Sequence, residues 1–119
     1  MTSRTPETIF ALASGSGRAG VSVFRVSGPD ASDVIKILTH KPAPKPRLSA
    51  LRTFYAAENR PIDAGLVLWM PGPASFTGED VAEFHTHGSP AVIEAMGQAF
   101  LGAGARLAEP GEFTRRAFE

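Results

Sequence analysis

The sequence predicts an α+β fold in which a mixed β-sheet is flanked by helices. Segments typical of strands and segments typical of helices are interleaved along the chain, but two strand-like segments follow each other directly. That pair indicates an antiparallel hairpin, which a doubly wound parallel sheet does not contain. A hydrophobic content of 43% in 119 residues is enough for one packed core. We therefore treat residues 1–119 as a single domain.

The first half of the chain predicts a strand, a helix and an extended connection. Residues 21–26 alternate and are bounded by glycines, as is typical of a strand. From Asp30 to Thr39, apolar residues recur at i, i+3, i+4 and i+7, the pattern of an amphipathic helix. The proline-rich residues 41–47 cannot continue this helix, so we expect an exposed connection.

The hairpin is predicted in the middle of the chain. Residues 51–57 and 62–70 both have strand composition, and the polar residues 58–61 between them suit a turn. The apolar run over residues 66–69 is continuous rather than alternating. It predicts that the second strand is buried on both faces.

The last third predicts two strands and two helices. Residues 81–87 alternate as a strand, and a serine followed by proline begins a helix over residues 89–101. Residues 105–108 form a short strand candidate, and residues 110–119 read as a loop that enters another helix. The sequence ends as that helix begins, so we expect a longer parent protein.

Composition excludes several classes of protein. Twelve Lys and Arg balance twelve Asp and Glu, so the composition predicts a domain that is no autonomous nucleic-acid binder. The absence of cysteine excludes disulfides, thiolate zinc sites and cysteine nucleophiles. No apolar run approaches the roughly 20 residues that span a bilayer, and the N-terminus has no secretory pattern. The cytoplasm is therefore the expected compartment.

A glycine-rich segment imitates a dinucleotide fingerprint. Gly15, Gly17 and Gly20 match G-x-G-x-x-G, but that motif needs a strand before it and a helix after it, whereas here a strand follows. We therefore predict a loop, with Arg18 at its tip either solvated or in contact with an anion or a partner subunit. The Walker-type phosphate loop is absent from these 119 residues, so they do not predict GTP hydrolysis by that route.

Arg25 is an unusual charge within a predicted strand. By alternation it shares a face with Val21 and Val23. A guanidinium among apolar neighbours needs a carboxylate, a bound anion or access to water. A structural ion pair, an exposed position on an edge strand and a ligand contact all remain open.

Glu83, His85 and His87 share one face of the strand over residues 81–87. They could form the metal site of a metal-dependent enzyme, Glu83 could accept adjacent N–H donors of a ligand, or the three could form a solvated or salt-bridged strand face. No catalytic residue and no metal ligand set is assigned. Near the chain end, we interpret Glu112, Arg115 and Arg116 as a solvated helix face.

Several segments together resemble the N-terminal domain of the MnmE/TrmE family. The two most specific are Thr77-Gly78-Glu79-Asp80 and Pro110-Gly111-Glu112-Phe113-Thr114, and the others lie in the family order along nearly the whole chain. The matching segments are Thr8-Ile9, residues 17–21, residues 24–29, Pro71, residues 75–80, His87-Gly88 and residues 104–118.

This resemblance implies a fold like the tetrahydrofolate-binding domain of the glycine-cleavage T-protein, and a homodimer. It implies a reduced folate, such as 5-formyltetrahydrofolate or 5,10-methylenetetrahydrofolate, as one-carbon donor, with Arg25 and Glu83 as the folate-contacting residues. The family acts with the flavoprotein MnmG/GidA on the wobble uridine of tRNA. GTP, magnesium and potassium would act in a GTPase part outside these residues. A ligand-free oligomerisation scaffold is the alternative.

Overall fold

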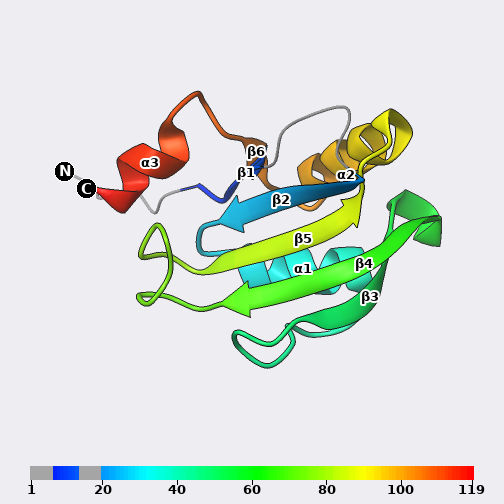
Figure 1. Ribbon diagram of the computed structural model, residues 1–119, viewed down its shortest axis with the longest axis horizontal. Helices are drawn as coiled ribbons and strands as arrows, with labels where there is room; N and C mark the ends of the chain where they lie inside the picture. Colours follow the sequence, from blue (N-terminus) through cyan, green and yellow to red (C-terminus); the bar gives the residue numbers. More distant parts are fainter. Residues whose placement is uncertain (1–6, 14–19) are drawn as a thin grey trace.

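The computed structural model describes residues 7–13 and 20–119, and its strands form one mixed six-stranded sheet in the order β3-β4-β5-β2-β1-β6 (Figure 1). The strands are β1 (Ile9–Leu12), β2 (Val21–Ser27), β3 (Ala50–Tyr55), β4 (Pro61–Met70), β5 (Val81–His87) and β6 (Arg106–Leu107). The helices are α1 (Ala31–Thr39), the short 3-10 helix η1 (Ala57–Asn59), α2 (Pro90–Gly102) and α3 (Glu112–Ala117).

The pairing of the strands confirms the predicted mixed sheet. β2 lies at the centre, antiparallel to β5 on one side and to β1 on the other, and β4 and β3 continue the antiparallel order beyond β5. Among the strands of the described residues, only the short β6 runs parallel to its neighbour, β1. The predicted hairpin is the antiparallel pair β3–β4, with η1 in its turn.

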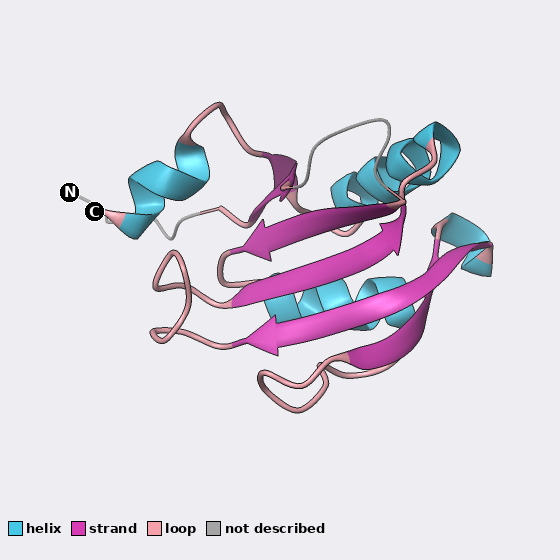
Figure 2. Ribbon diagram, in the orientation of Figure 1, coloured by secondary structure: helices cyan, strands magenta, loops and turns pink. Residues whose placement is uncertain are grey.

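One face of the sheet carries the hydrophobic core, because α1 and α2 both pack against it. Phe100 of α2 lies at the centre of an aromatic cluster, with ring centroids 5.0 Å from Phe10, 5.4 Å from Phe24 and 5.1 Å from Phe84. The apolar stripe of α1 is fully buried there, as its periodicity predicts. In Figure 2 these helices lie behind the strands, and the opposite sheet face is turned to the viewer.

The prediction that β4 is buried on both faces is wrong. Val67 is fully buried beneath the helices, whereas Leu66 on the opposite face is 39% exposed and Leu68 is partly exposed. The reason is that both core helices cover the same side of the sheet, so only alternate residues of β4 reach the core. The apolar run instead places hydrophobic side chains on the uncovered face, which we call the open face.

The predicted helix starts are also observed. The Ser89 hydroxyl accepts a hydrogen bond from the N–H of Val92 and caps α2, with Pro90 at its first position. The helix predicted from Asp30 begins at Ala31, one residue later. Within the described ranges, none of the helices has the length and apolar character that crossing a membrane requires.

Candidate functional site

Arg25 and Glu83 face each other across the central strand pair. They are direct register partners in β2 and β5, and Arg25 Nε donates a 2.9 Å hydrogen bond to Glu83 Oε2. Both lie on the open face, since Phe24 and Phe84 alternate with them toward the core. The structural ion pair that the sequence left open is therefore present, between two residues 58 positions apart.

The second carboxylate oxygen of Glu83 contacts His85, two residues along β5. The distance from His85 Nε2 to Glu83 Oε1 is 3.1 Å, and an ionised carboxylate can only accept, so the ring nitrogen carries the proton. Burial by itself raises the pKa of the Glu83 carboxyl, but the hydrogen bonds from Arg25 and His85 outweigh it and hold that pKa below its ordinary value. Glu83 is consequently an anion at neutral pH.

Arg25 keeps hydrogen-bonding capacity for a ligand. Its side chain is 42% exposed, compared with 17% for Glu83. Within the described residues, the side chain of Arg25 donates one hydrogen bond, from Nε. Its two terminal nitrogens therefore have no protein acceptor there. The pair therefore offers a fork of guanidinium donors beside a carboxylate acceptor.

A shallow hollow lies next to this pair on the open face. Its volume is about 270 Å³, and its lining combines the aliphatic side chains of Val21 and Leu66 with the rings of His85 and His87. His85 links the hollow to Glu83, because His85 lines the hollow and its ring donates a hydrogen bond to the Glu83 carboxylate. An aromatic ligand with polar edges suits this combination of apolar walls and charged groups.

A larger groove lies on the helix side of the molecule. Its volume is about 440 Å³, and it is lined mainly by apolar residues of α1, α2 and the end of β3, with Arg60 as its one charged lining residue. Neither Arg25 nor Glu83 reaches it. Size alone does not select this groove, since a hollow of about 470 Å³ lined by residues 107–114 is slightly larger. The Arg25–Glu83 pair lies on the open face, which we therefore take as the candidate site.

His87 does not join Glu83 and His85 in one cluster. Its Nδ1 lies 2.8 Å from Asp63 Oδ1, and its backbone N–H donates to Asp63 Oδ2 at 2.8 Å. Burial raises the pKa of Asp63, but these hydrogen bonds from His87 outweigh it and lower the pKa overall. No three His, Cys, Asp or Glu side chains in residues 7–13 and 20–119 are arranged to hold a metal ion. The salt-bridged interpretation of this strand face is confirmed.

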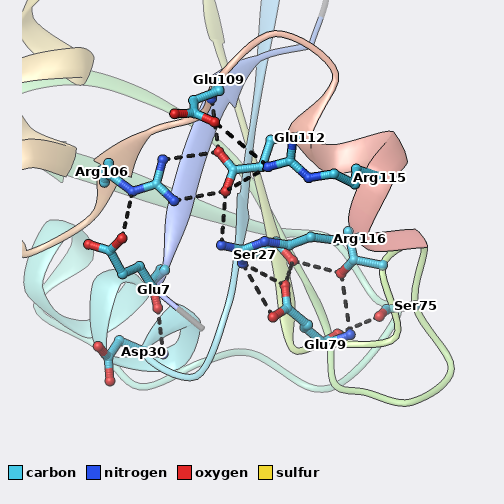
Figure 3. A network of polar contacts seen from close by, with 12 residues as sticks. Glu7, Ser27, Asp30, Ser75, Glu79, Arg106, Glu109, Glu112, Arg115 and Arg116 are labelled. Carbon is cyan, nitrogen blue, oxygen red and sulfur yellow. Dashed lines mark hydrogen bonds and ion pairs between the residues drawn. The ribbon is translucent and has the colours of Figure 1, made fainter. Parts of the chain in front are cut away.

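The interpretation of Glu112, Arg115 and Arg116 as a solvated helix face is wrong for Glu112 and Arg116, whereas Arg115, with a side chain that is 52% exposed, fits it. Glu112 is only 4% exposed. Its carboxylate accepts from Arg106 Nη1 at 3.0 Å and Nη2 at 2.8 Å, and from Arg116 Nη2 at 3.2 Å (Figure 3). The error arose because Arg106 lies in β6, outside the predicted helix, so the helix pattern alone could not show the buried partner.

The same network joins α3 to the loop between β4 and β5. Arg116 Nη1 donates to Glu79 Oε1 at 3.0 Å, and the hydroxyl of Ser27 donates to the same oxygen at 2.8 Å (Figure 3). Ser27 is also 2.6 Å from the Thr77 hydroxyl. The two segments most specific for the resemblance, residues 77–80 and 110–114, therefore belong to adjoining parts of one polar network over one end of the open face.

One candidate remains outside the described residues. Arg18 and most of the glycine-rich segment fall in residues 14–19, so the structure describes only Gly20 of that motif. The strand predicted after it is β2. Asp63 was missed by sequence reasoning, because its role depends on the pairing of β4 with β5 and no motif marks it.

These features define an α+β domain with a charged, partly apolar site on the uncovered face of its sheet. A family model described as the N-terminus of the GTP-binding protein TrmE matches residues 8–119. The chain belongs to this family.

Relatives of known name agree with that assignment. The tRNA modification GTPase MnmE of Maricaulis maris is 54% identical over 112 residues, which cover 94% of this chain and 26% of the relative. The protein of the same name from Phenylobacterium zucineum is 54% identical, with 95% and 25% coverage. The mitochondrial 5-taurinomethyluridine-[tRNA] synthase subunit GTPB3 of Danio rerio is 55% identical, with 94% and 23% coverage. The chain thus spans about a quarter of the length of these relatives.

Proposed function

We propose that this domain binds a reduced folate at Arg25 and Glu83 and forms a homodimer, as the N-terminal part of a GTPase that modifies the wobble uridine of tRNA. The relatives carry tRNA modification in their names, and the family match covers residues 8–119. The observation that carries the folate proposal is the Arg25–Glu83 pair on the open face, with the terminal nitrogens of Arg25 uncommitted among the described residues.

The chemistry of the pair suits a reduced folate of the 5-formyl- or 5,10-methylenetetrahydrofolate type. A pterin carries adjacent N–H donors on one edge, and an ionised carboxylate such as Glu83 can accept from such donors in addition to its present partners, because each oxygen has two lone pairs. Arg25 would donate to a carbonyl or carboxylate of the same ligand. Val21, Leu66 and the ring of His85 would pack against the flat pterin.

The wider assignment follows from the family. We infer a fold related to the tetrahydrofolate-binding domain of the glycine-cleavage T-protein, and a parent protein that works in the cytoplasm with the MnmG/GidA flavoprotein on tRNA. The folate would supply the one-carbon unit when bound. GTP, magnesium and potassium would act in the rest of the parent protein, because these 119 residues contain no Walker-type loop.

Titration calorimetry of 5-formyltetrahydrofolate into the chain tests the folate site. We expect saturable binding that is weakened at least about 30-fold in Arg25→Ala and in Glu83→Gln, because each change removes a charge-assisted hydrogen bond worth about 2 kcal/mol. Glu83→Gln keeps the size of the side chain but not its charge.

Matched controls lie outside the Arg25–Glu83 pair and the hollow beside it. Glu94→Gln neutralises an exposed glutamate on α2, and Arg115→Ala removes an arginine that is 52% exposed on α3. Both should bind folate as the unchanged chain does. A folded chain without measurable affinity would leave the oligomerisation scaffold as the better assignment, and equal affinity in all variants would move the site elsewhere, with the helix-side groove as the next candidate.

A further inference from the structure

The zero net charge of the chain conceals a strong segregation of its charges. Residues 36–60 contain six cations and a single carboxylate, Glu58. We call these six residues the basic edge. They are Lys36, Lys41, Lys45, Arg47, Arg52 and Arg60. All other carboxylates of the chain lie outside this segment, so the acidic groups that balance the count are located elsewhere.

Ion pairing divides the cations in the same way. Every lysine and arginine that the structure describes outside residues 36–60 lies within 4.0 Å of a carboxylate oxygen, and none of the basic edge does. The paired cations are Arg25, Arg106, Arg115 and Arg116. Five of the six cations of the basic edge are exposed, and Arg52 is intermediate. Their charge is therefore not neutralised within the described protein.

The fold places four residues of the basic edge along one border of the molecule. Lys41, Lys45, Arg47 and Arg52 belong to the proline-rich connection and the edge strand β3, which form the lower border in Figure 1. The other two are Lys36 on α1, which lies behind the sheet, and Arg60 in the turn after η1. The backbone N–H of Arg47 donates to Trp69 O at 2.9 Å, and its side chain donates to Ala74 O at 2.8 Å, so the connection is anchored to the sheet. Prolines at 42, 44 and 46 stiffen it further.

A polar hollow opens within this border. Lys41 and Arg52 line it together with Thr39, Thr53 and Tyr55, and its volume is about 280 Å³. The Nε of Arg52 is buried and has no hydrogen-bond partner in the described structure. A buried donor without an acceptor is costly, so a movement of the Arg52 side chain that brings this nitrogen to an anion in the hollow would be favourable.

We propose that the basic edge binds the phosphate backbone of RNA, with a phosphate in the hollow between Lys41 and Arg52. Cations spaced along an anchored, extended segment match a polymer that carries regularly spaced anions, and counterion release supplies the affinity. This surface is separate from Arg25 and Glu83. The inference deepens the proposed role in tRNA modification, because it names the part of the domain that would contact the RNA.

Fluorescence anisotropy with a fluorescein-labelled tRNA transcript at several KCl concentrations tests this surface. We compare the chain Met1–Glu119 with K41Q/K45Q, in which two exposed side chains lose their charge, and with K41R/K45R, which keeps it at the same positions. Neutralisation should weaken binding about tenfold or more and make the plot of log affinity against log salt shallower by about two units. K41R/K45R, and R115Q on α3, should bind as the unchanged chain does.

The outcomes are distinct from those of the folate test. K41Q/K45Q should bind 5-formyltetrahydrofolate normally, so loss of RNA binding with intact folate binding would place the RNA on the basic edge. Equal salt slopes for K41Q/K45Q and the unchanged chain, or no tRNA binding at low salt, would overturn the proposal. Competition by poly-L-glutamate as effective as competition by unlabelled tRNA would overturn it in favour of an acidic protein partner.

Discussion

Glu112 is a nearly buried carboxylate whose charge is compensated on several sides. The guanidinium of Arg106 binds both of its oxygens, and the backbone N–H of Glu109 and the side chain of Arg116 add further donors. The hydrogen bonds from Arg106 lower its pKa to about 2, against burial, which alone would raise it. Charge complementarity at this one residue therefore holds α3 against β6.

Glu112→Gln should destabilise the chain by about 2–3 kcal/mol at pH 7, because Arg106 and Arg116 lose their shared anion. Urea unfolding followed by circular dichroism measures this. The control is Glu109→Gln. The Glu109 side chain is 69% exposed, and its ion pair with Arg115 is a long one of 3.7 Å. We expect the control to differ from the unchanged chain by less than about 0.5 kcal/mol.

The sign of the pH dependence follows from the depressed pKa. Glu112 is protonated more readily in the unfolded chain than in the folded one, so its contribution is present above pH 4.5, the ordinary pKa, and is lost as the pH falls toward 2. The stability gap between the unchanged chain and Glu112→Gln should narrow over that interval. A gap that stays constant from pH 7 to low pH would contradict this account.

For single residues, the sequence predicts the environment of a side chain when its neighbours lie on the same strand or helix. Alternation in β2 and β5 singles out Arg25 and Glu83 as charges on strand faces, but their contact depends on the register of strands 58 residues apart. Glu112 could not be recognised in this way, because its main partner, Arg106, lies in another element.

Among the elements, β4 depends on one glycine for its close approach to β5. A Cβ on Gly65 would lie 1.8 Å from His85 O and 3.0 Å from Phe54 Cε2. No side chain fits there without displacing the backbone of β5. Since His85 also contacts Glu83, the position of this strand pair determines the geometry of the candidate site.

Gly65→Ala should therefore destabilise the chain by about 2 kcal/mol or more, because the methyl group forces β4 and β5 apart. Gly97→Ala makes the same chemical change inside α2, where nothing lies within 4 Å of the new Cβ. That control should gain about 0.5–1 kcal/mol from helix propensity. Thermal unfolding of both variants gives the comparison, and loss of stability in neither or in both would argue against strand separation at Gly65 as the cause.

The elements themselves were largely predictable, since alternation, helical periodicity and proline positions are local properties. The predicted strands, helices and hairpin are all present, with bounds shifted by a few residues. The burial of β4 was not predictable, because the run 66–69 has the same composition whether helices cover one face of the sheet or both. Only the packing of α1 and α2 on one side decides this.

For the whole molecule, the main consequence is a sheet with one face covered by helices and one face open. The open face carries Leu51 at 70% exposure, Val21 at 53% and Leu66 at 39%, beside the Arg25–Glu83 pair. Global composition could not show this, just as the zero net charge could not show the unpaired basic edge. Exposed apolar side chains beside a charged pair on an uncovered sheet face favour association with another surface.

We therefore expect the proposed homodimer to use the open face, and Leu66→Lys tests it. Sedimentation equilibrium should show a dimer for the unchanged chain. For the variant, the affinity between the two subunits should be at least about 30-fold weaker, because a lysine in the interface must be desolvated without a partner. Leu101→Lys is the matched control, since Leu101 is 50% exposed on α2, away from the open face. A dimer unaffected by Leu66→Lys, or one lost equally in both variants, would place the interface elsewhere and separate dimerisation from the folate site.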